Sequence, residues 1–143
     1  LPYACLVPFA TGTLKGASKA WPGFPTLCRQ LVPELPVLLM PGPGPETIQA
    51  RTDYPDAQTL AGVPLDVYAA LLAHSAVVVA NDTGPGHLAA AVGARLVSVL
   101  GPTDASRYRA LGPHVTLIQH HPWPEVDTVL QQAHQAIAAA RQG

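Results

Sequence analysis

The residues with the clearest chemical use lie between Asn81 and His87, where a short apolar run ends and a small-residue helix is expected to begin. Thr83 can cap that helix with its hydroxyl group, and Gly84 and Gly86 allow a ligand to approach the backbone closely. The first N–H groups of a helix lack partners within the helix, and the helix dipole favours negative charge there. The stretch therefore has the chemistry of an anion site, and phosphate is the anion that it suggests.

Two polar residues of this turn have alternative roles. His87 can donate a hydrogen bond to a phosphate, or to a carbonyl group at the end of a neighbouring strand. Asp82 would repel a diphosphate if it pointed inward, so its residue type alone favours accepting local backbone N–H groups. Any strand-to-helix turn also favours caps and glycines, so phosphate binding and plain capping both remain open.

Two further charged residues follow predicted strands. Lys19 lies in the polar loop 10–20, and Trp21-Pro22 directly after it would fix its direction; the alternative is a solvated surface lysine. Glu46 follows a proline-glycine run and could accept hydrogen bonds from both hydroxyls of a ribose. A plain acidic helix start is the alternative for Glu46, because carboxylates are stabilised near helix amino ends.

The rest of the chain must position these residues. Apolar runs predict strands, and apolar residues three and four positions apart predict helices. The strands are expected at 3–7, 36–40, 58–61, 76–80, 96–100 and 115–118, and the helices at 21–32, 46–51, 65–73, 88–92 and from about 124 onward. Such alternation, with strands apolar on both faces, predicts an α/β domain whose parallel sheet is covered by helices on both faces.

Two helices have a clear apolar face in the sequence. In the helix 65–73 that face consists of Leu65, Tyr68, Ala69, Leu72 and Ala73, and in the last helix it consists of Val126, Val129, Leu130, Ala133 and Ile137. We expect both faces to pack against the sheet.

Loops that follow the predicted strands are polar or rich in glycine and proline, at 9–20, 41–46, 81–87 and 101–112. In open parallel sheets, ligands bind in the crevice outside the carboxyl ends of the strands, near the point where the strand order reverses. We therefore expect these loops to converge on one binding site.

Composition limits the classes of partner. The 143 residues are enough for one domain, and 8 Lys+Arg against 9 Asp+Glu provide no basic field for nucleic acid. No apolar run approaches the roughly 20 residues of a membrane span, and no basic signal-peptide region starts the chain, so a soluble domain is expected. Cys5 and Cys28 fall in apolar patterns and are expected to be reduced core residues. The chain starts Leu1-Pro2-Tyr3 without methionine, which suggests a part of a longer protein.

Several common motifs are missing from the sequence. It contains no G-x-x-x-x-G-K-[ST] motif, and no G-x-G-x-x-G opens a helix after the first strand. These absences disfavour a P-loop NTPase and an ordinary dinucleotide dehydrogenase. No Asp-x-Asp is present and the six histidines show no ligand spacing, so we expect neither a metal nor a cofactor.

Several segments together resemble a known family. They are Leu60-Ala61-Gly62, the helix 65–72, the segment Val77–Ala91 with its N-D-T-G-P-G-H-L-A-A-A, and G-P-T-D at 101–104. In this order they resemble the carboxyl-terminal half of the ADP-heptose:lipopolysaccharide heptosyltransferases, glycosyltransferase family nine. The segment Gly16–Pro22 is similar to the Lys-x-Trp-Pro loop of that family.

The resemblance implies a GT-B protein, in which two Rossmann-like domains face each other across a cleft. Residues 1–143 would be the second domain, which binds the nucleotide-sugar donor, and the amino-terminal acceptor domain would be absent. The implied reaction transfers a heptose or related sugar from an ADP-sugar to a lipopolysaccharide core acceptor, with inversion and without a metal. It implies a cytoplasmic protein at the inner membrane without a transmembrane segment. A non-catalytic nucleotide-binding or regulatory module is the alternative.

The resemblance also implies roles for single residues. Lys19 would contact donor phosphate, with Thr11 or Thr13 supplying a hydroxyl nearby, and Glu46 would lie near the ribose. The residues implied at the diphosphate and sugar end are Asp82, Thr83, Gly84, Gly86 and His87. The general base would belong to the absent domain, so no catalytic residue is expected in this chain.

Overall fold

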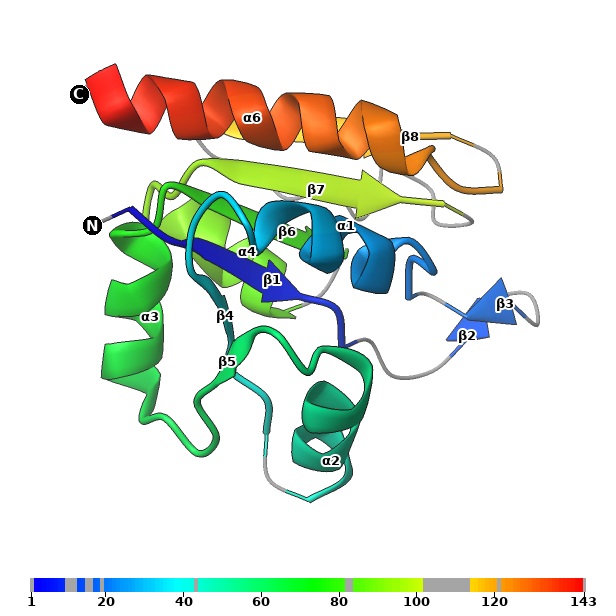
Figure 1. The fold of residues 1–143 in the computed structure, drawn as a ribbon, viewed down its shortest axis with the longest axis vertical. Coiled ribbons are helices and arrows are strands. Elements are labelled where there is room, and N and C mark those ends of the chain that lie inside the picture. Colours follow the sequence, from blue (N-terminus) through cyan, green and yellow to red (C-terminus); the bar gives the residue numbers. More distant parts are fainter. Residues whose placement is uncertain are drawn as a thin grey trace.

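A computed structural model describes residues 2–9, 13–14, 17–18, 20–42, 44–81, 84–101, 114–120 and 122–142. Strands and helices alternate along most of it (Figure 1). The elements are β1 (Ala4–Val7), β2 (Thr13–Leu14), β3 (Ala17–Ser18), α1 (Phe24–Leu31), β4 (Val37–Leu39), α2 (Pro45–Asp53), β5 (Gln58–Thr59), α3 (Leu65–Ala73), β6 (Val77–Asn81), α4 (Gly84–Ala91), β7 (Leu96–Leu100), β8 (Val115–Gln119) and α6 (Val126–Gln142). The predicted strands and helices are thus confirmed, most of them within a few residues at each end.

Six of the described strands form one sheet in the order β5-β4-β1-β6-β7-β8. Every neighbouring pair in it is parallel, as in Cys5 opposite Val78 and Val79 opposite Val97. Without the small β2-β3 hairpin, this is the Rossmann order 3-2-1-4-5-6, in which the chain reverses direction across the sheet between β1 and β6. The predicted α/β fold with a parallel sheet is therefore confirmed.

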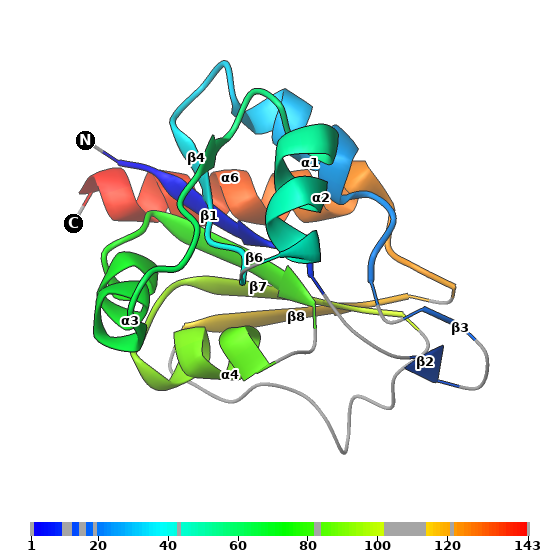
Figure 2. The ribbon, with the colours of Figure 1, turned by 90° about the horizontal axis from the view of Figure 1, so that it is seen from below.

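Helices cover both faces of the sheet (Figure 2). On one face, α1, α2 and α6 enclose a core that contains Phe24, Leu27, Tyr54 and Val129. On the other face, α3 and α4 cover Val78, Ala80 and Leu96. The central strands can be apolar on both faces because both are covered, which explains why their sequences do not alternate between apolar and polar residues.

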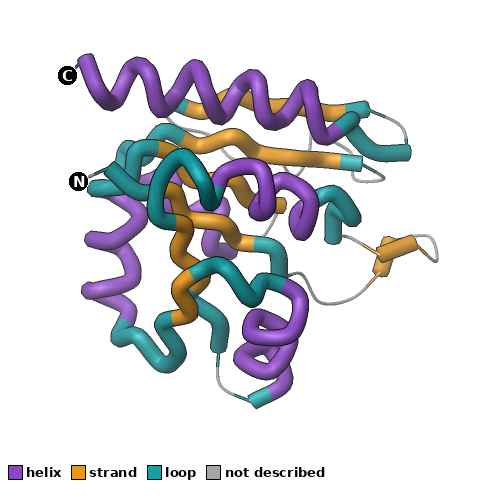
Figure 3. Tube along the Cα trace, in the orientation of Figure 1, coloured by secondary structure: helices purple, strands orange, loops and turns teal. Residues whose placement is uncertain are grey.

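The loop 10–20 contains an element that no pattern in the sequence predicts. Thr13–Leu14 and Ala17–Ser18 pair as an antiparallel hairpin, which lies beyond the end of β1 (Figure 3). The strands have only two residues each, and the segment has few large apolar side chains. Such short strands leave no hydrophobic period by which they could be recognised.

Two expectations about helices are wrong in detail. The first helix begins at Phe24, so Trp21 and Pro22 precede it and Pro25 is the proline of its first turn. Leu65 does not face the core, because 73% of it is exposed. The helix α3 packs through its second half, where Leu72 is fully buried and Leu71 accepts a 2.7 Å hydrogen bond from the Tyr3 hydroxyl. The last helix has the expected face, with Val129, Ala133 and Ile137 buried.

Within the described ranges, no helix has both the length and the apolar character that crossing a membrane requires.

Candidate functional site

The carboxyl ends of the parallel strands define one edge of the domain. The arrows of β1, β6 and β7 point the same way, towards the side on which the β2-β3 hairpin lies (Figure 1). The last matched residues of the central pair are Val7 and Ala80. Pro8 and Asn81 come directly after them, at the reversal point between β1 and β6 where sheets of this order bind ligands.

Asn81 joins three segments at this point. Its side-chain Oδ1 accepts a 2.9 Å hydrogen bond from the backbone N–H of Trp21, and its Nδ2 donates a 3.3 Å bond to the carbonyl oxygen of Pro8. Only 1% of Asn81 is exposed. A buried amide is costly unless its donor and acceptor groups find partners, and here each has one. Asn81 thereby holds together the end of β1, the end of β6 and the approach to α1.

Trp21 extends this connection to the last helix. Its indole Nε1 donates a 3.0 Å hydrogen bond to the carbonyl oxygen of Pro124, two residues before α6 begins. Its ring lies edge-on to Phe24, with the centroids 5.0 Å apart and the planes at 72°. Trp21 is buried, so the residue that follows the loop 10–20 is anchored by both its backbone and its side chain.

Gly101 brings the end of β7 against the same region. A Cβ atom at this position would overlap the carbonyl oxygen of Pro122 and the ring of Trp123. A glycine is therefore required here for close approach between two segments. The first residue of the G-P-T-D motif has a packing role that its position in the sequence does not reveal.

The helix α4 starts at the same edge, soon after β6 ends. It runs from Gly84 to Ala91, with Gly86 buried and His87 exposed near its amino end. Ala89 and Ala90 are buried against the sheet, where small side chains allow the helix to lie close to it. The amino end of α4 therefore provides the partial positive charge that favours an anion at the reversal point.

The structure describes only some of the predicted site residues. Thr11, Lys19, Asp82 and Thr83 lie outside the described residues. For Thr13 and Gly84 only the secondary structure is described, the start of β2 and the first residue of α4. The positions of Gly86 and His87 in α4 are given above, and Glu46 lies in the first turn of α2.

Glu46 closes its own turn at the end of β4. Its Oε1 accepts a 2.9 Å hydrogen bond from the N–H of Gly42, and the hydroxyl of Thr47 donates a 2.8 Å bond to the Gly42 carbonyl oxygen. Gly44 precedes the helix with φ of 78°, a left-handed conformation that glycine adopts without strain. One acceptor site of the Glu46 carboxylate thus stabilises the loop, and its remaining acceptor sites are open to a further hydrogen-bond donor.

Burial suppresses the ionisation of several groups in the core. It raises the pKa of the Cys5 thiol to about 12 and that of Cys28 to about 11. Neither forms a disulfide, which agrees with the predicted core roles. Burial, with smaller contributions from Cys5 and Glu46, also raises the pKa of Tyr68 to about 12. At neutral pH these groups are uncharged, so neither thiol acts as a nucleophile.

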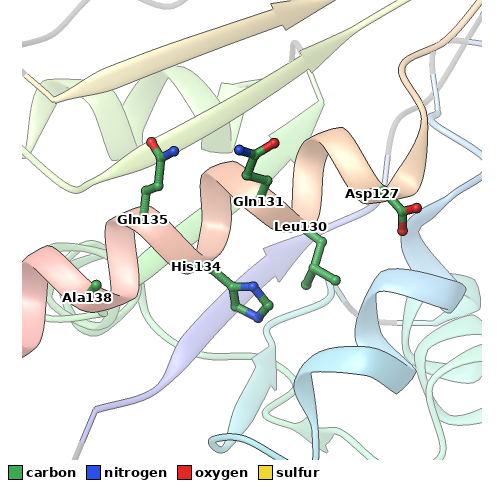
Figure 4. Close-up of a pocket in the computed structure, with 6 residues that line it drawn as sticks. All are labelled: Asp127, Leu130, Gln131, His134, Gln135 and Ala138. Atoms are coloured by element: carbon green, nitrogen blue, oxygen red, sulfur yellow. The ribbon is translucent and has the colours of Figure 1, made fainter.

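A surface groove runs along α6, from its first turn at Asp127 to Ala138. Asp127, Leu130, Gln131, His134, Gln135 and Ala138 line it (Figure 4). The His134 Nε2 lies 2.8 Å from Oε2 of Glu34, which follows α1, and both side chains are nearly half exposed. An exposed pair of this kind contributes little stability, and the groove lacks the helix amino end of the reversal point. We place the candidate site at the carboxyl edge.

Comparisons with solved structures give the same fold. The chain is 24% identical to the E. coli heptosyltransferase WaaC in its structure with ADP, covering 94% of this chain and 44% of that one, with a TM-score of 0.81. It is 23% identical to the E. coli ADP-heptose lps heptosyltransferase II, covering 98% of this chain and 47% of that one, with a TM-score of 0.77. It is 25% identical to WaaC in its structure with ADP-2-deoxy-2-fluoro heptose, covering 96% of this chain and 42% of that one, with a TM-score of 0.71. The chain thus spans less than half the length of these proteins.

No curated protein matches the sequence significantly. The sequence model of glycosyltransferase family 9 (heptosyltransferase) matches residues 2–137, nearly the whole chain. This match agrees with the resemblance noted from the D-T-G-P-G-H and G-P-T-D motifs and from the Lys-x-Trp-Pro loop. The chain therefore belongs to glycosyltransferase family 9.

Proposed function

We propose that this chain is the donor-binding domain of a glycosyltransferase. The full protein would transfer a heptose or related sugar from an ADP-sugar to a lipopolysaccharide core acceptor at the cytoplasmic side of the inner membrane. The observation that carries this proposal is the position of α4, whose amino end follows β6 at the reversal point of a family 9 domain. The solved heptosyltransferases named with ADP and an ADP-heptose analogue support the choice of donor.

The proposed roles follow the chemistry of a departing diphosphate. In glycosyl transfer, negative charge grows on the diphosphate, so groups that hold this charge more strongly in the transition state lower the barrier. We assign this role to Lys19, His87 and the backbone at 82–86, with Thr11 or Thr13 supplying a hydroxyl. The lysine and the helix amino end together would replace a metal ion, and Glu46 would hold the ribose.

The reaction also needs a general base to activate the acceptor hydroxyl. We assign that base, and the acceptor site, to an amino-terminal domain outside this chain. The domain described here would then bind the donor and stabilise the leaving group, and inversion would follow from direct attack of the acceptor on the sugar.

Calorimetric titration with ADP tests the donor site. We expect the protein to bind ADP, and we expect Lys19→Ala and His87→Ala each to weaken binding roughly 10- to 100-fold, the effect of losing a charge-assisted hydrogen bond. Lys15→Ala and His114→Ala are matched controls, because one changes a lysine in the same loop and the other an exposed histidine before β8. Absence of heat at millimolar ADP, or unchanged affinity in both site variants, would contradict the site assignment.

A transfer assay tests the division of labour between domains. With an ADP-heptose donor and a lipopolysaccharide core acceptor, the 143-residue chain alone is expected to give no product. The full-length protein is expected to give product of inverted anomeric configuration, at a rate that EDTA does not change. Robust turnover by the chain alone would show that the base lies within it. ADP binding without transfer by the full-length protein would favour a non-catalytic nucleotide-binding module instead.

A further inference from the structure

Asn81 has no role in the proposed chemistry, yet the structure gives it an unusual position. The buried polar side chains of the described residues are Ser75, Asn81 and Ser98. Ser75 donates a hydrogen bond to the carbonyl oxygen of Leu72, three residues earlier, and also contacts the Cys5 thiol of β1. Asn81 instead bonds to Pro8 and Trp21, which are 73 and 60 residues away in the sequence. It therefore links segments that nothing local brings together.

Sheet pairing alone would not hold these segments. Val7 pairs with Ala80, but Pro8 has no N–H group, so the ladder between β1 and β6 cannot continue past it in the usual way. The Asn81 side chain bonds the Pro8 carbonyl oxygen and so joins the two segments just beyond the last matched pair of strand residues. An amide suits this place because it carries both an acceptor oxygen and a donor NH2 group, whereas an ionised carboxylate has no donor for a carbonyl oxygen.

The bonded segments lead directly into the predicted phosphate ligands. Lys19 is two residues before Trp21 in the sequence. Asp82 follows Asn81, and the amino end of α4 comes two residues later. Trp21 is itself fixed by the bond from its indole to Pro124. Asn81 therefore connects the end of the lysine loop to the start of the loop before α4.

We propose that Asn81 is a positioning residue for donor binding: it fixes Trp21, which directly follows the loop 10–20, against the end of β6, which directly precedes Asp82. This inference rests on the proposed function. Charge-assisted hydrogen bonds depend on the distance between donor and acceptor, so a change in loop separation weakens the phosphate contacts first. Contacts with the nucleoside do not depend on how these two loops hold the phosphates, so they are retained.

The test compares two ligands in the full-length protein. Affinities for ADP and for adenosine are measured for the wild type, Asn81→Leu and the control Ser75→Ala. Leucine is similar in size to asparagine but makes no hydrogen bond. We expect Asn81→Leu to lower the affinity for ADP about tenfold, the effect typical of losing one buried hydrogen bond. The affinity for adenosine is expected to stay within about twofold of the wild type. Ser75→Ala also removes a buried hydrogen bond, but Ser75 lies just before the start of β6, whereas Asn81 lies at its end. This control is expected to change neither affinity.

Trp21→Phe is a second variant in case Asn81→Leu does not fold. It keeps an aromatic ring but removes the indole bond to Pro124, so it loosens the same connection from its other side. Trp21→Phe too is expected to lower the affinity for ADP more than the affinity for adenosine. Unchanged ADP affinity in a folded Asn81→Leu protein, or equal losses for both ligands, overturns the positioning role. If the wild type fails to bind ADP, the proposed function itself is wrong and this inference falls with it.

Discussion

Replacing Phe24 with alanine is expected to lower the free energy of unfolding by about 3–5 kcal/mol, the usual cost of removing a buried phenyl ring. Phe24 is fully buried at the start of α1 and contacts Trp21 edge to face. The helices α1, α2 and α6 enclose it against the sheet, so the cavity left by the ring cannot collapse easily. A loss of this size is a large part of the 5–15 kcal/mol that stabilises a typical domain.

Urea unfolding followed by tryptophan fluorescence measures this loss, because Trp21 and Trp123 both lie in the core region that would open. Ile48→Ala is the matched control. Ile48 is 68% exposed on α2, so its truncation is expected to change stability by less than about 0.5 kcal/mol. A Phe24→Ala loss no larger than that of Ile48→Ala would show that α1 does not pack as described.

Gly101→Ala is expected to destabilise the protein by about 3 kcal/mol, at the upper end of typical overpacking costs. The new methyl group would overlap the Pro122 carbonyl oxygen and the Trp123 ring. The backbone carbonyl cannot turn away as a flexible side chain can, so the segment before α6 must shift. We expect the shift to loosen the Pro124 contact of Trp21 as well, because Pro124 lies two residues beyond Pro122.

Thermal unfolding measures the effect, with Gly42→Ala as the matched control. Gly42 also follows a strand at the carboxyl edge, but a Cβ atom there would make only an ordinary 3.4 Å contact with Oε1 of Glu46. We expect the midpoint to fall by several degrees more in Gly101→Ala than in Gly42→Ala. Equal midpoints for the two variants would contradict the close approach of the β7 end to Trp123.

Strands and their order differ in how far the sequence predicts them. The run Val77-Val78-Val79-Ala80 is apolar on both faces, and its sequence alone predicts a buried strand, which β6 confirms. The placement of β1 between β4 and β6 depends on pairing between residues far apart in the chain. Local patterns contain no information on that pairing, so the sequence predicts a parallel sheet but not the order of its strands.

The errors in the elements have local causes. Trp21-Pro22 looks like a helix start because proline favours first turns, but the Trp21 N–H bonds to Asn81 instead of lying within a helix. Leu65 has helical spacing with Tyr68 and Leu72, but the sheet supports only the later part of α3, and Leu65 is exposed. In both cases a tertiary contact, or its absence, overrode a sound local preference.

The candidate site shows the same division. The motif at Asp82–His87 predicted a helix start suited to an anion, and α4 does begin there, at Gly84. The anion site itself stays a prediction. Asn81 begins the stretch 81–87 but was not among the predicted site residues, although a polar residue at the end of an apolar strand is a signal that could have identified it. Gly101 was noted only as part of the G-P-T-D motif, because its partner Trp123 lies 22 positions further along the sequence.

The sequence by itself determined the α/β class, the family and the turn suited to an anion, because apolar periods, caps and motifs are properties of neighbouring residues. Only the tertiary structure decided that Pro8, Trp21 and Asn81 meet at the reversal point. It also decided that Gly101 packs so closely against Trp123 that a Cβ atom would overlap the ring. These contacts join residues that the chain separates widely, and they form only once the sheet has brought the strand ends to one edge. Their specificity is therefore a property of the packed fold.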